Sequence, residues 1–182
     1  MASLTNKTLF IIFLIIYITR LVVIILIKKE KIYLKKEAKK IIALAYAWML
    51  ISTTLFPILI PPVGINHVTI NYNVLELFNY VDIKTGIYNV IGNIVLFIPM
   101  YFCININYKS LSGKYMFVAS VLVSVLIEVL QLIENISGLA DFTSRVTDIN
   151  DVILNTLGGM IGWLIYETYK KIKSKKITFQ KT

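Results

Sequence analysis

Five apolar runs, each close to twenty residues long, constrain what this chain can fold into. They cover about residues 9–27, 41–60, 87–104, 115–133 and 149–166. A helix needs ~20 such residues to cross a ~30 Å hydrocarbon core. The Ile and Val residues in these runs would favour strands in water. In lipid, however, a single segment satisfies its own backbone hydrogen bonds only as a helix. We therefore predict an all-α, polytopic membrane helix bundle of about five transmembrane helices, with residues 1–182 forming one membrane domain.

The composition agrees with a membrane protein. Apolar residues make up 57% of the 182 residues, more than a soluble domain of this size can bury. The net charge of +9 comes from lysines between the apolar runs, so membrane topology explains it better than nucleic acid, and we expect no nucleic-acid partner. Because Cys103 and His67 are single residues of their types, internal disulfides and zinc sites built from several His or Cys are excluded.

The distribution of basic residues predicts the orientation in the cell (cytoplasmic) membrane. The positive-inside rule assigns lysine-rich loops to the cytoplasm. Lysine-rich segments follow the first and fifth runs, and two lysines separate the third run from the fourth. The rule therefore places the N-terminus outside and the C-terminus in the cytoplasm. The residues predicted to be cytoplasmic are Lys28, Lys29, Lys31, Lys35, Lys36, Lys39, Lys40, Lys109, Lys114, Lys170, Lys171, Lys173, Lys175, Lys176 and Lys181, and those predicted to be outside are Lys7, Lys84 and Arg145.

One long segment, residues 61–86, is predicted to lie outside. Pro61, Pro62 and Gly64 are expected to end the second helix. Residues 74–80 fit a short interfacial helix with aromatic side chains at headgroup level. A plain extracellular loop fits the segment equally well.

Polar side chains inside the apolar runs mark the candidate site, because they are costly in lipid and are often functional. Asn89 and Asn93 in the third run are four residues apart and share one helix face. In the fourth run, polar residues fall within about 80° of one another at about 100° per residue. These residues are Ser120, Ser124, Glu128 and Gln131.

The fifth run begins with a similar stripe. Asp148, Asp151 and Asn155 lie within about 60° of one another. Gly159 and Gly162 continue this stripe, and small residues there should let another helix approach closely. At ~1.5 Å per residue, Asn93, Glu128 and Asn155, one from each of the three runs, lie within about 10 Å of the outer boundary. We therefore expect them, with Arg145, to line one outward-facing cavity.

Each of these side chains also has a simpler structural explanation. Asp148 and Asp151 could cap the fifth helix and complement its dipole. The asparagines could bond between helices, and Glu128 could form a purely structural ion pair with Arg145. Arg20, in the first run, can extend to the cytoplasmic surface along its own alkyl chain.

Three segments resemble the VanZ-like family of bacterial integral membrane proteins. Residues 89–99 carry N-x-x-G-N and a later F-x-P, residues 124–131 carry S-x-x-x-E-x-x-Q, and residues 145–158 carry R-x-x-D-x-x-D-x-x-x-N-x-x-G. The similar stretch covers about residues 85–165, and the family core is expected over about residues 41–166. The resemblance supports these ligand-binding candidates: Asn89, Asn93, Glu128, Gln131, Arg145, Asp148, Asp151 and Asn155.

The resemblance implies a phenotype class and no particular reaction. The founding member of the family is associated with reduced susceptibility to the glycopeptide antibiotic teicoplanin, by a route that leaves the D-Ala-D-Ala target unchanged. We therefore expect this protein to lower glycopeptide susceptibility by binding or altering an extracytoplasmic membrane lipid or cell-envelope precursor.

Three alternatives remain open. The first is a membrane enzyme acting on a phospholipid or envelope-precursor headgroup, although Ser124 has no nearby His or Lys in the sequence to act as its base. The second is a structural or partner-binding membrane protein in which the polar residues form an internal brace. The third is a transporter, which fits poorly because the chain shows no clear repeats.

The cofactor question is also open, and no catalytic residue or metal is assigned. Arg145 could bind a phosphate bidentately. Glu128, Asp148 and Asp151 could bind a divalent cation such as Mg²⁺. If these four residues form one poorly solvated cluster, it should hold a proton or recruit a cation, because carboxylates crowded in such a place resist full ionisation.

Overall fold

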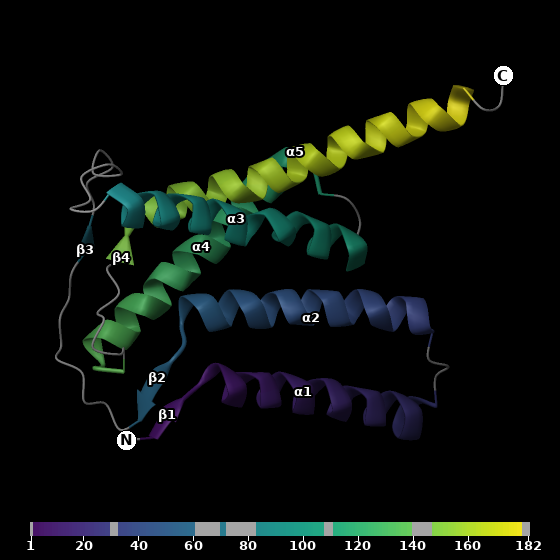
Figure 1. Ribbon diagram of the computed structural model, residues 1–182. Helices are drawn as coiled ribbons and strands as arrows, with labels where there is room; N and C mark the ends of the chain where they lie inside the picture. Colours follow the sequence, from purple (N-terminus) through teal and green to yellow (C-terminus); the bar gives the residue numbers. More distant parts are fainter. Residues whose placement is uncertain are drawn as a thin grey trace. The chain divides into compact units, whose positions relative to one another are not determined.

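The computed structural model describes residues 2–29, 33–60, 70–71, 83–107, 111–139 and 147–179, and most of these residues are helical (Figure 1). The prediction of an all-α fold with five long helices is confirmed. The helices are α1 (Asn6–Val22), which continues into the π-helical segment η1 (Val23–Lys28), α2 (Leu34–Thr54), α3 (Ile83–Asn107), α4 (Gly113–Ile136) and α5 (Ile149–Phe179). The short strands are β1 (Ala2–Leu4), β2 (Ile58–Ile60), β3 (Ile70–Asn71) and β4 (Thr147–Asp148).

In the described part of the chain, three helical segments are long and apolar enough to cross a membrane. They are Asn6–Ile27, Gly86–Ile106 and Gly113–Ile136. Many of their large apolar side chains are exposed, as lipid-facing residues should be. Helices α2 and α5 each have a lysine-rich end, which shortens their apolar part. That these two helices also cross the membrane remains a prediction.

The bounds of the second helix differ from the predicted residues 41–60. Helix α2 begins at Leu34, because residues 34–40 consist mainly of Lys, Glu and Ala, which are good helix formers. It ends at Thr54, and the chain then runs extended through Ile58–Ile60. The prediction that Pro61, Pro62 and Gly64 end this helix is therefore wrong. Pro57 accounts for the earlier end, since proline lacks an N–H and disfavours helical geometry in the residue before it.

The chain divides into two units, which are described separately. Unit 1 consists of Met1–Asn71 and Leu126–Thr147, and unit 2 consists of Tyr72–Val125 and Asp148–Thr182. In unit 1, α1 and α2 lie side by side and run in opposite directions (Figure 1). Strands β1 and β2 pair antiparallel, with Ala2 opposite Ile60 and Leu4 opposite Ile58, so the ends of the two helices are joined as well.

Unit 2 is built on the packing of α3 against α5 (Figure 1). Three glycines explain how closely the helices approach. A Cβ atom at Gly158 or Gly162 would overlap the carbonyl oxygen of Ile94 or Ile98 on α3, and one at Gly159 would overlap Oγ of Ser120 on α4. The prediction that Gly159 and Gly162 contact another helix closely is confirmed. The fully buried apolar side chains around this contact include Phe97, Tyr101 and Met116.

The predicted outside segment, residues 61–86, falls mostly outside the described residues. This applies to Pro61, Pro62 and Gly64 and to the whole of the proposed interfacial helix at residues 74–80.

Candidate functional site

The first candidate contact joins α3 to α5. Asp151 lies in the first turn of α5, and Nδ2 of Asn93 on α3 donates a hydrogen bond of 2.5 Å to its Oδ1. Gly158 lies seven residues, about two turns, further along α5, where the two backbones touch. The close approach of the helices therefore brings this short amide side chain within reach of the carboxylate.

The second contact joins α5 to α4. Asn155 lies about one turn after Asp151, and its Nδ2 donates to Oγ of Ser124 at 2.8 Å. Both side chains are buried, Asn155 being 3% exposed and Ser124 fully enclosed. Oδ1 of Asn155 is also buried and accepts no hydrogen bond from the described residues. This oxygen is thus available to a hydroxyl or amide donor.

Asp148 is the last residue of β4 and immediately precedes α5. Its Oδ1 accepts hydrogen bonds of 2.8 Å from both the backbone N–H and the side-chain Nδ2 of Asn150. A carboxylate that accepts from a backbone N–H two residues ahead has the geometry of a helix N-cap. Asp148 makes further interactions as well, so capping is one part of its role.

In unit 1, the second half of α4 carries the other predicted residues. Nε2 of Gln131 donates to the backbone carbonyl of Thr54 at 2.9 Å. Thr54 is the last residue of α2, and the last carbonyls of a helix lack partners within the helix. Glu128, about one turn before Gln131, is buried at 6% exposure and has interaction partners of its own.

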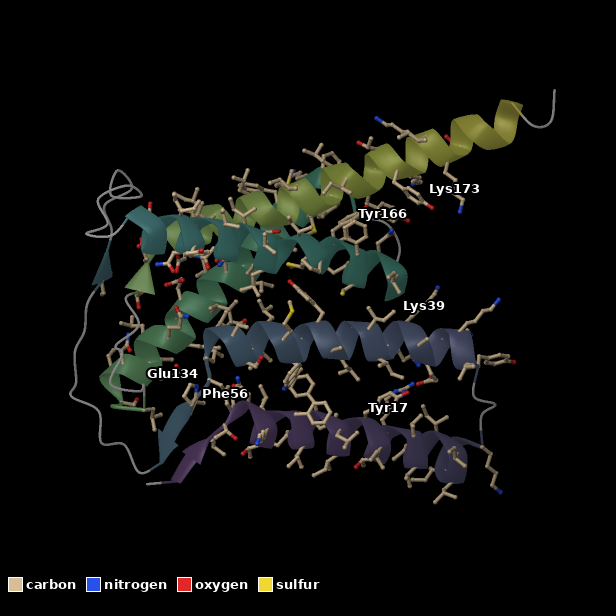
Figure 2. All side chains as sticks on the ribbon, in the orientation of Figure 1. Tyr17, Lys39, Phe56, Glu134, Tyr166 and Lys173 are labelled. Carbon is tan, nitrogen blue, oxygen red and sulfur yellow. The ribbon has the colours of Figure 1, made fainter. Side chains whose placement is uncertain are left out.

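The sequence prediction omitted several buried polar residues near these positions. Asn150 belongs to the hydrogen bonds of Asp148 described above, whereas Ser124 was already predicted on the polar face of the fourth run. Glu134 (Figure 2) and Asn135 lie in the last turn of α4 and are also buried. A signal was available for Asn135, since it follows Gln131 by four residues and continues the polar face of α4.

Two predicted residues do not join these contacts. Arg145 lies outside the described residues, so the predicted cluster of Arg145 with Glu128, Asp148 and Asp151 is untested. Asn89 is described and lies exposed on α3. Within the described ranges, no group of three His, Cys, Asp or Glu side chains is placed to hold a metal ion.

A second charged cluster, not predicted as a site, lies between α1 and α2. Arg20 binds Glu37 bidentately, with Nη1 at 2.6 Å from Oε2 and Nη2 at 3.0 Å from Oε1. Nζ of Lys40 and the hydroxyl of Tyr17 (Figure 2) donate to the same carboxylate at 3.1 and 3.3 Å. We name these four residues the Glu37 cluster. Glu37 falls in a lysine-rich segment that the apolar pattern predicts to be a loop, so no partner for Arg20 was predicted.

The charge of the Glu37 cluster is well defined. Glu37 precedes the apolar part of α2, which begins at Ile41. The hydrogen bond from Arg20, reinforced by Lys40, lowers the pKa of the Glu37 carboxyl to about 2. The carboxylate is therefore ionised at neutral pH.

Comparison with known proteins agrees with the three motifs. The sequence matches the VanZ/LLP1 family over residues 10–170. It is also 31% identical to Protein VanZ of Enterococcus faecium over 116 residues, an alignment that covers 59% of this chain and 67% of that protein. No solved structure matches the chain. The family match includes Asn93, Ser124, Asp151 and Asn155, whose side chains form the contacts described above, and the chain belongs to the VanZ/LLP1 family.

Proposed function

We propose that this protein lowers susceptibility to glycopeptide antibiotics of the teicoplanin type, by binding or altering an extracytoplasmic lipid or cell-envelope component. The proposed binding residues in unit 2 are Asn93, Ser124, Asp151 and Asn155. The observation that carries the proposal is the hydrogen bond between Asn93 and Asp151, which holds a carboxylate between two helices. Carboxylates in such positions are costly and are usually kept for function.

The neighbouring groups suit a polar headgroup. The buried Oδ1 of Asn155 accepts nothing from the described residues, and leaving a buried acceptor unpaired costs about 1–3 kcal/mol. A hydroxyl or amide of a bound headgroup would satisfy this oxygen. The described contacts supply hydrogen bonds and charge, and they include no nucleophile with its base, so binding is preferred over catalysis.

An internal brace is the second candidate, because the same hydrogen bonds link α5 to α3 and α4. The variant Asp151→Asn separates the two functions. The Asn side chain keeps the size and the Oδ1 acceptor, so the link to Asn93 can persist while the charge is lost. For a binding site, we expect normal protein level and teicoplanin susceptibility equal to that of cells lacking the protein.

The matched control is Glu167→Gln, which makes the same acid-to-amide change further along α5. We expect this variant to retain the phenotype. Immunoblotting of membranes and a susceptibility assay measure the two quantities. A fall in the level of Asp151→Asn, with Glu167→Gln unchanged, would favour the brace and contradict the binding site.

The proposed orientation, with the N-terminus outside and the C-terminus in the cytoplasm, has its own test. In a Cys103→Ser background, a cysteine replacing Asn73 should react with a membrane-impermeant maleimide added to intact cells. A cysteine replacing Lys35 should react only after the cells are opened. This outcome follows from the positive-inside rule. The reverse labelling pattern would show that the protein has the opposite orientation, and it would contradict an outward-facing site.

A further inference from the structure

The Glu37 cluster carries an excess positive charge. Two cations, Arg20 and Lys40, share the single carboxylate of Glu37, so the cluster has a net charge of +1. Tyr17 adds a neutral hydroxyl donor to the same carboxylate, and its ring lies 5.8 Å from the Arg20 guanidinium carbon. The cluster therefore has more donors and positive charge than its acid can satisfy.

Both cations retain unused hydrogen-bond donors. A guanidinium has five N–H groups and an ammonium has three, whereas Glu37 takes two from Arg20 and one from Lys40. Neither cation has another hydrogen-bond partner among the residues that the structure describes. Their side chains are 31% and 44% exposed. The remaining donors are thus open to a ligand at the surface of the helix pair.

The cluster lies close to a membrane boundary. Arg20 is seven residues before Ile27, the end of the first candidate span, which corresponds to about 10 Å along the helix. Lys40 immediately precedes the apolar part of α2. The two cations lie at one level because they bind the same carboxylate. An unneutralised cation at this depth is costly, and long basic side chains relieve the cost by reaching the headgroups.

We propose that Arg20 and Lys40 bind the phosphate of an anionic membrane phospholipid at the lysine-rich end of the α1–α2 pair. The planar guanidinium can hold two phosphate oxygens, and Lys40 adds a second cation. Glu37 keeps the two cations together. The neighbouring lysines Lys35 and Lys36, which are exposed on the first turns of α2, add the local positive potential that attracts anionic lipids.

Exposed apolar side chains indicate a lipid as the source of the phosphate. Ile12, Ile15 and Ile16 precede Arg20 on α1, on the side toward the middle of the span, and are 44%, 56% and 56% exposed. Acyl chains attached to the bound phosphate would cover these side chains, whereas a free phosphate would leave them bare. The inference concerns unit 1 and does not depend on the proposed function.

Titration of the purified full-length protein with phosphatidylglycerol or phosphatidylcholine, followed by native mass spectrometry, tests the proposal. The parent protein should bind phosphatidylglycerol in preference to phosphatidylcholine. Lys40→Gln should weaken phosphatidylglycerol binding about fivefold, which corresponds to the ~1 kcal/mol expected per basic residue near an anionic surface. Glu37→Gln should strengthen phosphatidylglycerol binding, because the lipid phosphate no longer competes with a carboxylate for Arg20 and Lys40. Lys171→Gln, the same change on α5, should alter it less than twofold.

The two variants of the Glu37 cluster are expected to act in opposite directions, which a merely structural pair would not produce. Lys40→Gln breaks one of several contacts to Glu37, so circular dichroism should show an unchanged helix content. Three results would overturn the proposal. The first is an equal loss of phosphatidylglycerol binding in Lys40→Gln and Lys171→Gln. The second is weaker phosphatidylglycerol binding in Glu37→Gln. The third is displacement of the lipid by inorganic phosphate at equal concentration.

Discussion

Gly162→Leu should abolish most of the folded protein, whereas Gly92→Leu should be tolerated. A Cβ atom at Gly162 would already overlap the carbonyl oxygen of Ile98, and backbone cannot move aside as a flexible side chain can. Overpacking of this kind costs about 1–3 kcal/mol or more, and a leucine adds three further carbons to the clash. Fluorescence-detected size-exclusion chromatography of a fusion protein, with a thermal melt, measures the loss.

Gly92 is the matched control for this prediction. It lies within α3, as Gly162 lies within α5, but a Cβ atom there would meet nothing within 4 Å. A leucine at this position would extend into open space or lipid and should not lower the melting temperature. Normal folding of Gly162→Leu would mean that the α3–α5 contact is not required. An equal loss of folded protein in both variants would mean that any leucine in these helices is harmful.

Arg145→Lys and Glu128→Gln should each return teicoplanin susceptibility to that of cells lacking the protein. In the outward-facing cavity predicted from the sequence, Arg145 is expected to bind a phosphate through its planar fork, which lysine cannot reproduce although it keeps the charge. Glu128 is buried, and replacing it by Gln removes its ionisable carboxyl group while preserving its shape. The susceptibility assay compares strains with membrane levels of the protein matched by immunoblotting.

The comparison also distinguishes a site from a structural pair. A structural ion pair would tolerate Lys at position 145 better than a phosphate site would. If both variants behave like the parent protein at matched levels, this cluster is not the functional site, and the structural interpretation should replace it. If instead Glu128→Gln cannot be brought to the parental level, Glu128 supports the fold.

The helices were predictable from the sequence because lipid leaves an apolar run few alternatives. Their ends were less predictable. The apolar pattern does not distinguish a lysine-rich loop from a lysine-rich helical turn, so residues 34–40 and the last part of α5 were assigned to loops, although they are helical. The end of α2 was placed at Pro61 because the apolar run continues to Ile60, whereas Pro57 already interrupts the helix.

The candidate site was predictable where helical spacing determines the contact. The stripe on α5 correctly indicated a shared face, since Asp151 and Asn155 both contact neighbouring helices. The identity of each partner did not follow from spacing. Gln131 binds a backbone carbonyl, that of Thr54, and sequence patterns carry little information on such acceptors. The pairing of Arg20 with Glu37 was missed because it depends on the antiparallel register of α1 and α2.

The glycine contacts of α5 have a mechanical consequence. Gly158 and Gly162 touch carbonyl groups of α3 about one turn apart, and two such contacts prevent α5 from sliding or rotating against α3 by small steps. The same helix continues without a break from Ile149 to Phe179. A force applied near Phe179, by a fused domain or a bound protein, can therefore shift Asp151 only if α3 moves with it. The carboxylate of Asp151 and the amide of Asn93 would therefore move together as one rigid unit.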